Sequence, residues 1–202
     1  MLIESKLPIK LDILIETVLA QFKTNTETDA ATIQAIKEFC LDRLSVNLRE
    51  QGASPQEVDA VLSLNPALLS DIPQRLAAVR AFSTLQEAPA LAAANKRVGN
   101  ILKKVEGQIN TNISADLLKE SAEIALNDAL SKTKPDADKL FESGDYTASL
   151  QSLAALKAPV DDFFDNVMVN ADDPALKANR LGLLATLHQA MNRVADLSKL
   201  AS

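Results

Sequence analysis

Positively charged and amide side chains gather in one short stretch of this 202-residue sequence, between residues 95 and 104. Lysine and arginine attract phosphate groups, and arginine and asparagine can donate hydrogen bonds to the edges of unpaired bases. This combination of residue types favours a site for a polyanion such as RNA. The candidate residues are Asn95, Lys96, Arg97, Asn100, Lys103 and Lys104, together with Arg180 and Arg193 further along the chain.

Each candidate also has an ordinary structural interpretation. A lysine on a helix surface is more often simply solvated, and Asn95 and Arg97 could hydrogen-bond to a neighbouring helix instead. Arg180 could pair with the acidic segment 161–165, because the guanidinium group suits bidentate binding of carboxylates. The residue types alone leave both interpretations open.

The residues that usually perform catalysis are scarce. The sequence has one His, one Cys and no Trp, whereas metal sites and nucleophile–base pairs usually combine several His, Cys or carboxylate side chains. His188 has no His, Cys or paired carboxylate at ligand spacing, and Cys40 is best interpreted as a small buried hydrophobic residue. We therefore expect no catalytic residue and no metal site in this chain.

Charge is distributed unevenly along the chain, which carries a formal net charge of −6. Residues 91–110 and 174–202 each have four Lys or Arg against one Asp or Glu, whereas residues 111–173 have five against 13. A net acidic protein is a poor candidate for non-specific nucleic-acid binding, but a local basic patch can recognise single-stranded RNA loops. The single Cys and the lack of an apolar segment of about 20 residues favour a soluble, cytoplasmic protein.

The elements that position these residues are predicted to be helices. The chain has five Gly, six Phe, one Tyr and many Ala and Leu, which favours an all-α fold over a β-rich one. Apolar residues recur at helical spacing, with Pro, Ser or Asp at several expected helix starts. The expected helices span 11–22, 33–48, 54–64, 71–85, 89–105, 122–143 (which Pro135 should kink or interrupt), 146–156, 159–167 and about 25 residues from Pro174.

Two parts of the sequence resemble a known family. The stretch LAAANKRVGNILKK over residues 91–104 resembles the helix that opens the anticodon-binding domain in beta subunits of the bacterial, heterotetrameric glycyl-tRNA synthetases. The stretch VDDFFDNVMV over residues 160–169, followed by DDPAL over 172–176, is similar to the C-terminal signature of the same subunits. Ordered matches of this kind extend over residues 89–200.

The resemblance implies a helical bundle of the DALR anticodon-binding class over residues 89–202, preceded by a smaller helical region, residues 1–88, from the tail of the subunit's central body. The family's subunit is several times longer, so the chain is expected to be its C-terminal part. The resemblance further implies binding of the glycine tRNA, whose last two anticodon bases are cytosine. Under this hypothesis Asn95, Arg97 and Asn100 contact bases or backbone, Lys96, Lys103 and Lys104 contact phosphates, and Arg180 and Arg193 add further contacts.

The same resemblance implies that this chain has no active site of its own. In the family the alpha subunit carries the ATP- and glycine-binding site, so ATP and magnesium are expected there, in an alpha2beta2 assembly that charges the glycine tRNA. Neither DNA nor a membrane is an expected partner. The alternative is a non-catalytic helical scaffold whose basic helices bind an acidic protein, and the salt dependence of tRNA binding distinguishes the two.

Overall fold

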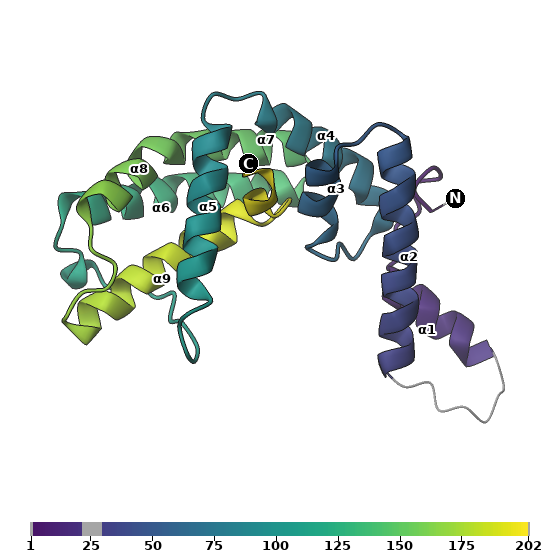
Figure 1. Cartoon of the computed structure of the whole chain (residues 1–202), viewed down its shortest axis with the longest axis horizontal. Coiled ribbons are helices and arrows are strands. Elements are labelled where there is room, and N and C mark those ends of the chain that lie inside the picture. Colours follow the sequence, from purple (N-terminus) through teal and green to yellow (C-terminus); the bar gives the residue numbers. More distant parts are fainter. Residues whose placement is uncertain (1, 22–29, 202) are drawn as a thin grey trace.

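The computed structural model describes residues 2–21 and 30–201, and within them the chain is built from α-helices and short 3₁₀ turns (Figure 1). The only β-type pairing in this part of the chain is an isolated bridge between Lys10 and Leu68. The all-α prediction is confirmed. The α-helices are α1 (Leu11–Gln21), α2 (Ala30–Glu50), α3 (Pro55–Leu62), α4 (Ile72–Ser83), α5 (Ala88–Leu102), α6 (Ser121–Glu142), α7 (Tyr146–Ser152), α8 (Lys157–Asn166) and α9 (Pro174–Met191). The 3₁₀ turns are η1 (Leu69–Asp71), η2 (Ala115–Leu117), η3 (Leu153–Leu156) and η4 (Leu197–Leu200).

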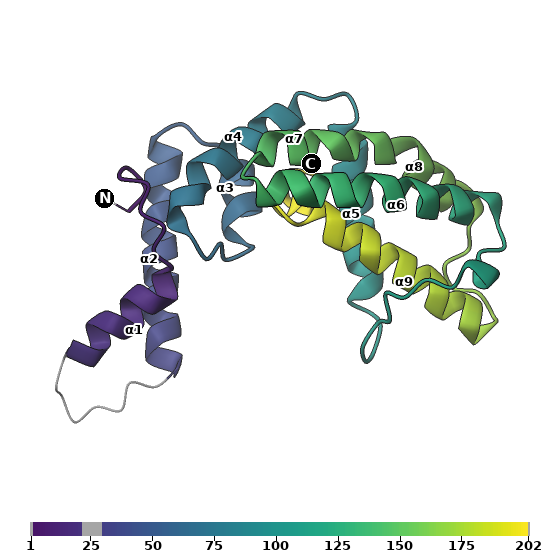
Figure 2. The ribbon, with the colours of Figure 1, turned by 180° about the vertical axis from the view of Figure 1, so that it is seen from behind.

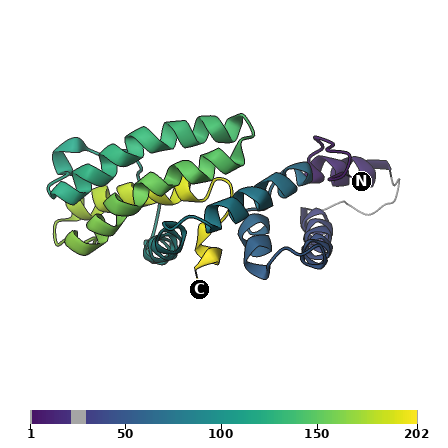
Figure 3. The same cartoon turned by 90° about the horizontal axis from the view of Figure 1, so that it is seen from above.

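The helices form two unequal groups in space. α7, α8 and α9 pack against α6, and α5 crosses this group while contacting α8 and α9 (Figure 1; Figure 2). α3 and α4 join the bundle because α4 packs on α7 and α3 packs on η4. α1 and α2 pack on each other at the opposite end of the molecule, where α2 contacts α3 (Figure 3).

Local sequence signals determine where two of the helices begin. At α3, the Ser54 hydroxyl accepts a hydrogen bond from the Glu57 N–H (3.2 Å), and the Glu57 carboxylate accepts one from the Ser54 N–H (2.7 Å). At α9, the Asp173 carboxylate accepts a hydrogen bond from the Ala175 N–H (2.7 Å), and Pro174 follows as the first helical residue. These side chains satisfy donors that the first turn of a helix leaves unpaired, so both predicted starts are confirmed.

The terminal helix is shorter than the spacing of apolar residues predicts. α9 ends at Met191 after 18 residues instead of about 25. The Asn192 side chain explains the end, because it donates a hydrogen bond to the His188 carbonyl (2.7 Å) and accepts one from the Leu197 N–H (3.2 Å). Val194 and Leu197 are buried as their apolar character predicts, but they lie in the following turn and in η4, which packs against α5.

Smaller expectations also need correction. α6 continues through Pro135, so the proline does not interrupt the helix; Ser131, whose carbonyl loses its donor, is exposed to water. α8 begins at Lys157 instead of Pro159, because η3 links it directly to α7. Cys40 is only partly buried, at the edge of the core. Phe22, the expected end of the first helix, lies outside the described residues.

The two ends of the molecule differ in how well their apolar side chains are covered. In the bundle, large side chains such as Phe82, Leu126 and Phe163 are completely buried. Most large apolar side chains that are exposed in the described ranges lie on or next to α1 and α2, and these are Ile9, Ile13, Val18, Phe39 and Val46. No helix within those ranges is long and apolar enough to cross a membrane.

Candidate nucleic-acid interface

α5 divides the basic stretch of the sequence between a buried and an exposed side. Leu91, Ala94 and Val98 are buried against the bundle, and the opposite side of the helix therefore faces solvent. Lys96 and Arg97 on that side, and Lys103 and Lys104 just after the last residue of α5, form no ion pair with a carboxylate within residues 2–21 and 30–201. We call the exposed set the α5 basic face, and it consists of Lys96, Arg97, Asn100, Lys103 and Lys104.

Four residues of the α5 basic face surround one shallow hollow of about 410 Å³. They are Lys96, Arg97, Asn100 and Lys104. Lys103 is exposed beside them but does not line the hollow. The structure thus brings together four of the eight residues that the sequence indicated, with side chains suited to phosphates and to polar base edges.

A larger groove of about 590 Å³ adjoins this hollow and shares Arg97 and Lys104 with it. Its other wall is the segment 167–170, which leads from α8 towards α9, and Lys177 of α9 adds a cation. Sequence reasoning missed this wall, because residues from distant parts of the chain form it. The positive charge of residues 174–202 was the one signal that pointed to Lys177. We call this feature the α5–α9 groove.

Arg97 is held by an aromatic side chain at the edge of the groove. Its guanidinium carbon lies 4.1 Å from the centroid of the Phe164 ring, a distance typical of a cation–π contact. Phe163 is fully buried and Phe164 only partly, which confirms the prediction that adjacent helical positions would place one ring in the core and one near the surface. The two rings meet edge to face with centroids 5.7 Å apart.

Asn95 belongs to the buried side of α5. Its side chain is completely buried and exchanges two hydrogen bonds with the side chain of Asn192, at 2.8 and 2.9 Å. The sequence held a signal for this burial, because Asn95 lies four residues after Leu91 and three before Val98, on the same helical face. The contacts of Asn95 are therefore those of a structural residue that ties α5 to the end of α9.

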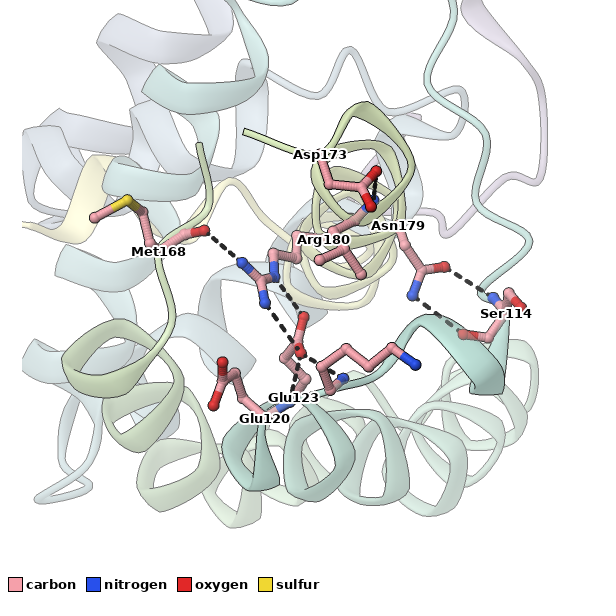
Figure 4. A network of polar contacts seen from close by, with 9 residues as sticks. Ser114, Glu120, Glu123, Met168, Asp173, Asn179 and Arg180 are labelled. Atoms are coloured by element: carbon pink, nitrogen blue, oxygen red, sulfur yellow. Dashed lines mark hydrogen bonds and ion pairs between the residues drawn. The ribbon is translucent and has the colours of Figure 1, made fainter. Parts of the chain in front are cut away.

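Arg180 is also buried, at the centre of a polar network between α6 and α9 (Figure 4). Its Nε donates a hydrogen bond to Glu123 Oε1 at 2.6 Å, and its Nη1 donates one to the Met168 carbonyl at 2.8 Å. Its carboxylate partner is thus Glu123, and not the acidic segment 161–165 that the sequence suggested. The ion pair is enclosed, because the side chains of Glu123 and Arg180 are 0% and 6% exposed.

The surroundings of Glu123 keep its carboxyl group charged. Burial alone would raise the pKa of Glu123, but hydrogen bonds from Arg180 and from two backbone N–H groups just before α6 lower that pKa below its ordinary value. The backbone donors lie 2.8 and 2.9 Å from the carboxylate. Next to Arg180, Asn179 makes two hydrogen bonds with the backbone of Ser114, at 2.8 and 3.1 Å (Figure 4). α9 is therefore connected both to α6 and to the segment before α6 that contains Ser114.

Arg193 lines neither the hollow nor the α5–α9 groove. It forms ion pairs with Asp138 and with Glu142, the latter at 3.2 Å. Its guanidinium carbon also lies 4.5 Å from the centroid of the Phe141 ring. The charge of Arg193 is therefore balanced by carboxylates of α6, unlike the charges of the α5 basic face.

The described residues supply charged and amide side chains around the hollow and the groove. They contain no cluster of three or more His, Cys, Asp or Glu side chains that could hold a metal ion. His188 is half-buried, and burial lowers the pKa of its imidazole. The charge of Asp196 raises that pKa, and the charge of Lys103 lowers it. Around the α5 hollow and groove, cations, amides and an aromatic ring come together. This combination suits nucleic acid, whose phosphates are anionic and whose bases stack on planar groups.

Comparison with known proteins agrees with this geometry. The chain is 61% identical over 201 residues to the glycine–tRNA ligase beta subunit of Leptothrix cholodnii. It is 60% identical to the subunits of the same name from Methylobacillus flagellatus and Dechloromonas aromatica. These alignments cover 100% of this chain but 28% of each relative. Residues 91–199 match the family described as DALR anticodon binding domain. Because this match takes in more than half of the chain, including the whole candidate interface, the chain belongs to the DALR anticodon-binding domain family.

Proposed function

We propose that this chain is the anticodon-binding, C-terminal part of a glycine–tRNA ligase beta subunit and that it binds the glycine tRNA. The observation that carries the proposal is the α5 basic face, whose cations have no carboxylate partner among the described residues and which lies in the region of the family match. The names of the similar proteins support glycine tRNA as the ligand. A net charge of −6 means that binding depends on this local patch instead of on the overall charge.

The candidate residues then divide into two roles. Lys96, Lys103 and Lys104 neutralise phosphates of the anticodon arm, while Arg97 and Asn100 face its bases or sugars. We assign the other three candidates to the framework, since their polar groups already have protein partners, and these are Asn95, Arg180 and Arg193.

The remaining parts of the activity belong to other parts of the assembly. We propose that an alpha subunit supplies the ATP, magnesium and glycine sites, that the two subunits form an alpha2beta2 enzyme, and that the enzyme works in the cytoplasm. Two findings support this division: the similar proteins are named beta subunits, and this chain spans 28% of their length. In this view the chain holds the tRNA for ATP-dependent charging elsewhere.

We further propose that the chain divides near residue 88 into the tail of a central body, 1–88, and the anticodon-binding domain, 89–202. The family match, which begins at residue 91, supports this position. α3 and α4 nevertheless pack on α7 and η4, so the end of the first region rests directly on the second.

The test is binding of this chain to glycine tRNA transcripts over a series of salt concentrations. One transcript carries the natural anticodon, and the other has both anticodon cytosines replaced. We expect tighter binding of the natural transcript and a loss of affinity as salt increases. Equal binding of both transcripts would contradict anticodon recognition, and binding to an acidic protein but not to tRNA would favour the scaffold alternative.

A further inference from the structure

The α5–α9 groove has the shape and lining of a site for one planar, partly polar ligand group. One wall comes from the end of α5 and the residues after it, and the other from the segment 167–170 and from α9. Apolar side chains line it on both sides, and polar or charged side chains lie among them. The apolar members are Ile101, Val105, Val167, Met168, Val169 and Leu181.

The first wall presents a planar cation in a fixed position. Arg97 lies 4.1 Å over the Phe164 ring and has no hydrogen bond or ion pair with another residue in the described ranges. A guanidinium group has two faces, and an exposed one stacks readily on an unpaired base. Because Phe164 already orients Arg97, little conformational entropy is lost when a base stacks on it.

The second wall presents an apolar side chain on a backbone that is held in place. Met168 is 73% exposed, yet its carbonyl accepts the hydrogen bond from the buried Arg180. The next residue towards α8, Val167, donates its N–H to the Phe163 carbonyl at 2.9 Å. A methionine side chain is flexible and polarizable, so that it adapts to the face of an aromatic ring.

The polar members of the lining match the edges of cytosine. Lys104 and Lys177 supply positive charge for the phosphate of a nucleotide. Glu106 supplies a carboxylate that can accept a hydrogen bond from the exocyclic amino group of cytosine, and Asn170 supplies an amide that can donate to its ring acceptors. Uracil has a carbonyl oxygen in place of that amino group, and a carboxylate would repel it.

We propose that the α5–α9 groove binds one unstacked cytosine nucleotide, with the base between Arg97 and Met168 and its amino group towards Glu106. This inference deepens the proposed function and rests on it for the identity of the RNA. It adds a defined subsite, a stacking pair and a residue that selects the base. It also gives the buried Arg180 a positioning role, because Arg180 holds the Met168 backbone.

The subsite can be tested with a single nucleotide and an internal control. The sequence has three methionines, of which Met168 lines the groove and Met191 is completely buried. In a chain labelled with ¹³C at the methionine methyl groups, titration with cytidine monophosphate should shift the Met168 signal and leave that of Met191 in place. A Met168 signal that does not move would overturn the proposal.

The stacking contact is tested by Arg97→Lys, which keeps the positive charge but removes the planar group. We expect the affinity for cytidine monophosphate, and for the natural tRNA transcript, to fall roughly tenfold, with an unchanged salt dependence. The matched control is Arg43→Lys, since Arg43 lies 5.3 Å over the Phe39 ring on α2, outside the groove. Equal affinities of Arg97→Lys and the unchanged chain would rule out stacking at this site.

The choice of base is tested by Glu106→Gln with uridine monophosphate as the competing ligand. The unchanged chain should bind cytidine monophosphate more tightly, and the variant should bind both nucleotides about equally, because a glutamine amide can accept or donate. A preference that survives in Glu106→Gln would overturn the role of Glu106. These titrations contain no tRNA, so they distinguish failure of the subsite from failure of the anticodon function, which the transcripts test separately.

Discussion

Asn95 and Arg97 lie two positions apart on α5 and have opposite surroundings. Asn95 is completely buried and paired with Asn192, whereas Arg97 is exposed and rests on the Phe164 ring. Both residue types can bind RNA, so their identity alone did not separate them. The spacing of the neighbouring apolar residues indicates that Asn95 is buried. No local pattern could show that Phe164, which is distant in sequence, lies beneath Arg97.

The Arg180–Glu123 pair should contribute strongly to stability. In Arg180→Ala, a completely buried carboxylate loses its cation and two hydrogen bonds. We expect the free energy of unfolding, measured by urea denaturation at pH 7, to fall by about 3–5 kcal/mol. The comparison variant is Arg49→Ala, which breaks the exposed pair with Asp59 and should cost about 0–1 kcal/mol. Equal losses in the two variants would contradict a structural role for Arg180.

His188 should make the stability of the chain sensitive to mild acid. Burial lowers the pKa of its imidazole in the folded chain. The charge of Asp196 raises this pKa, and the charge of Lys103 lowers it. The unfolded chain therefore binds a proton at His188 at a higher pH than the folded chain does. The free energy of unfolding falls as the pH drops from above about 6.5 to below the lowered pKa of His188 in the folded chain. Thermal unfolding of His188→Gln should vary less between pH 7 and pH 5 than that of the unchanged chain. An identical pH profile would show that His188 is not responsible.

At the scale of elements, helix starts were easier to predict than helix ends. The Ser54 and Asp173 caps lie within a few residues of the donors that they satisfy, so the local sequence reveals them. The end of α9 depends instead on Asn192, which is held by Asn95 from α5. The apolar spacing continues through Val194 and Leu197 because both residues are buried in the next element. Hydrophobic spacing reports burial and does not by itself report a break in the helix.

Gly182 on α9 should tolerate no side chain. An added Cβ would lie much closer to the Asn110 carbonyl oxygen than van der Waals contact allows, and this oxygen is backbone and moves only with its loop. We expect Gly182→Ala to lower the free energy of unfolding by about 1–3 kcal/mol. Gly99→Ala is a matched control in α5, because its Cβ would meet only the movable end of His188 at 3.4 Å. It should be neutral or stabilise by up to about 1 kcal/mol. A Gly182→Ala variant as stable as Gly99→Ala would contradict the close approach.

At the scale of the molecule, the fold decides which of the cations in the sequence remain available to the proposed RNA ligand. The sequence indicated the basic stretch, and four of its residues surround one hollow. It could not indicate the α5–α9 groove, whose walls are some 60 residues apart along the chain. Nor could it show which cations are neutralised by carboxylates, since the nearest carboxylate partners of Arg180 and Arg193 lie 57 and 51 positions away along the chain.

Reversing one charge of the α5 basic face should weaken tRNA binding in a salt-dependent manner. For Lys104→Glu we expect lower affinity and a slope of log affinity against log salt that is smaller by about one, since one phosphate contact is lost. Lys132→Glu changes the net charge equally on the exposed surface of α6, and should leave the affinity nearly unchanged. The measurement is the tRNA affinity of Lys104→Glu and of Lys132→Glu at several salt concentrations. Equal effects would mean that only the net charge matters.

The packing of α1 and α2 has a consequence for hydrogen exchange. These helices pack mainly on each other and on α3, and they carry exposed apolar side chains, so they can open without disrupting the bundle. Amide protons in α1 and α2 should therefore exchange through local opening, whereas those in α5, α6 and α9 should exchange only through global unfolding. Mass spectrometry of deuterium uptake should show two rates, and Arg180→Ala should accelerate only the slower one. One common rate would mean that the whole chain opens as a single cooperative unit.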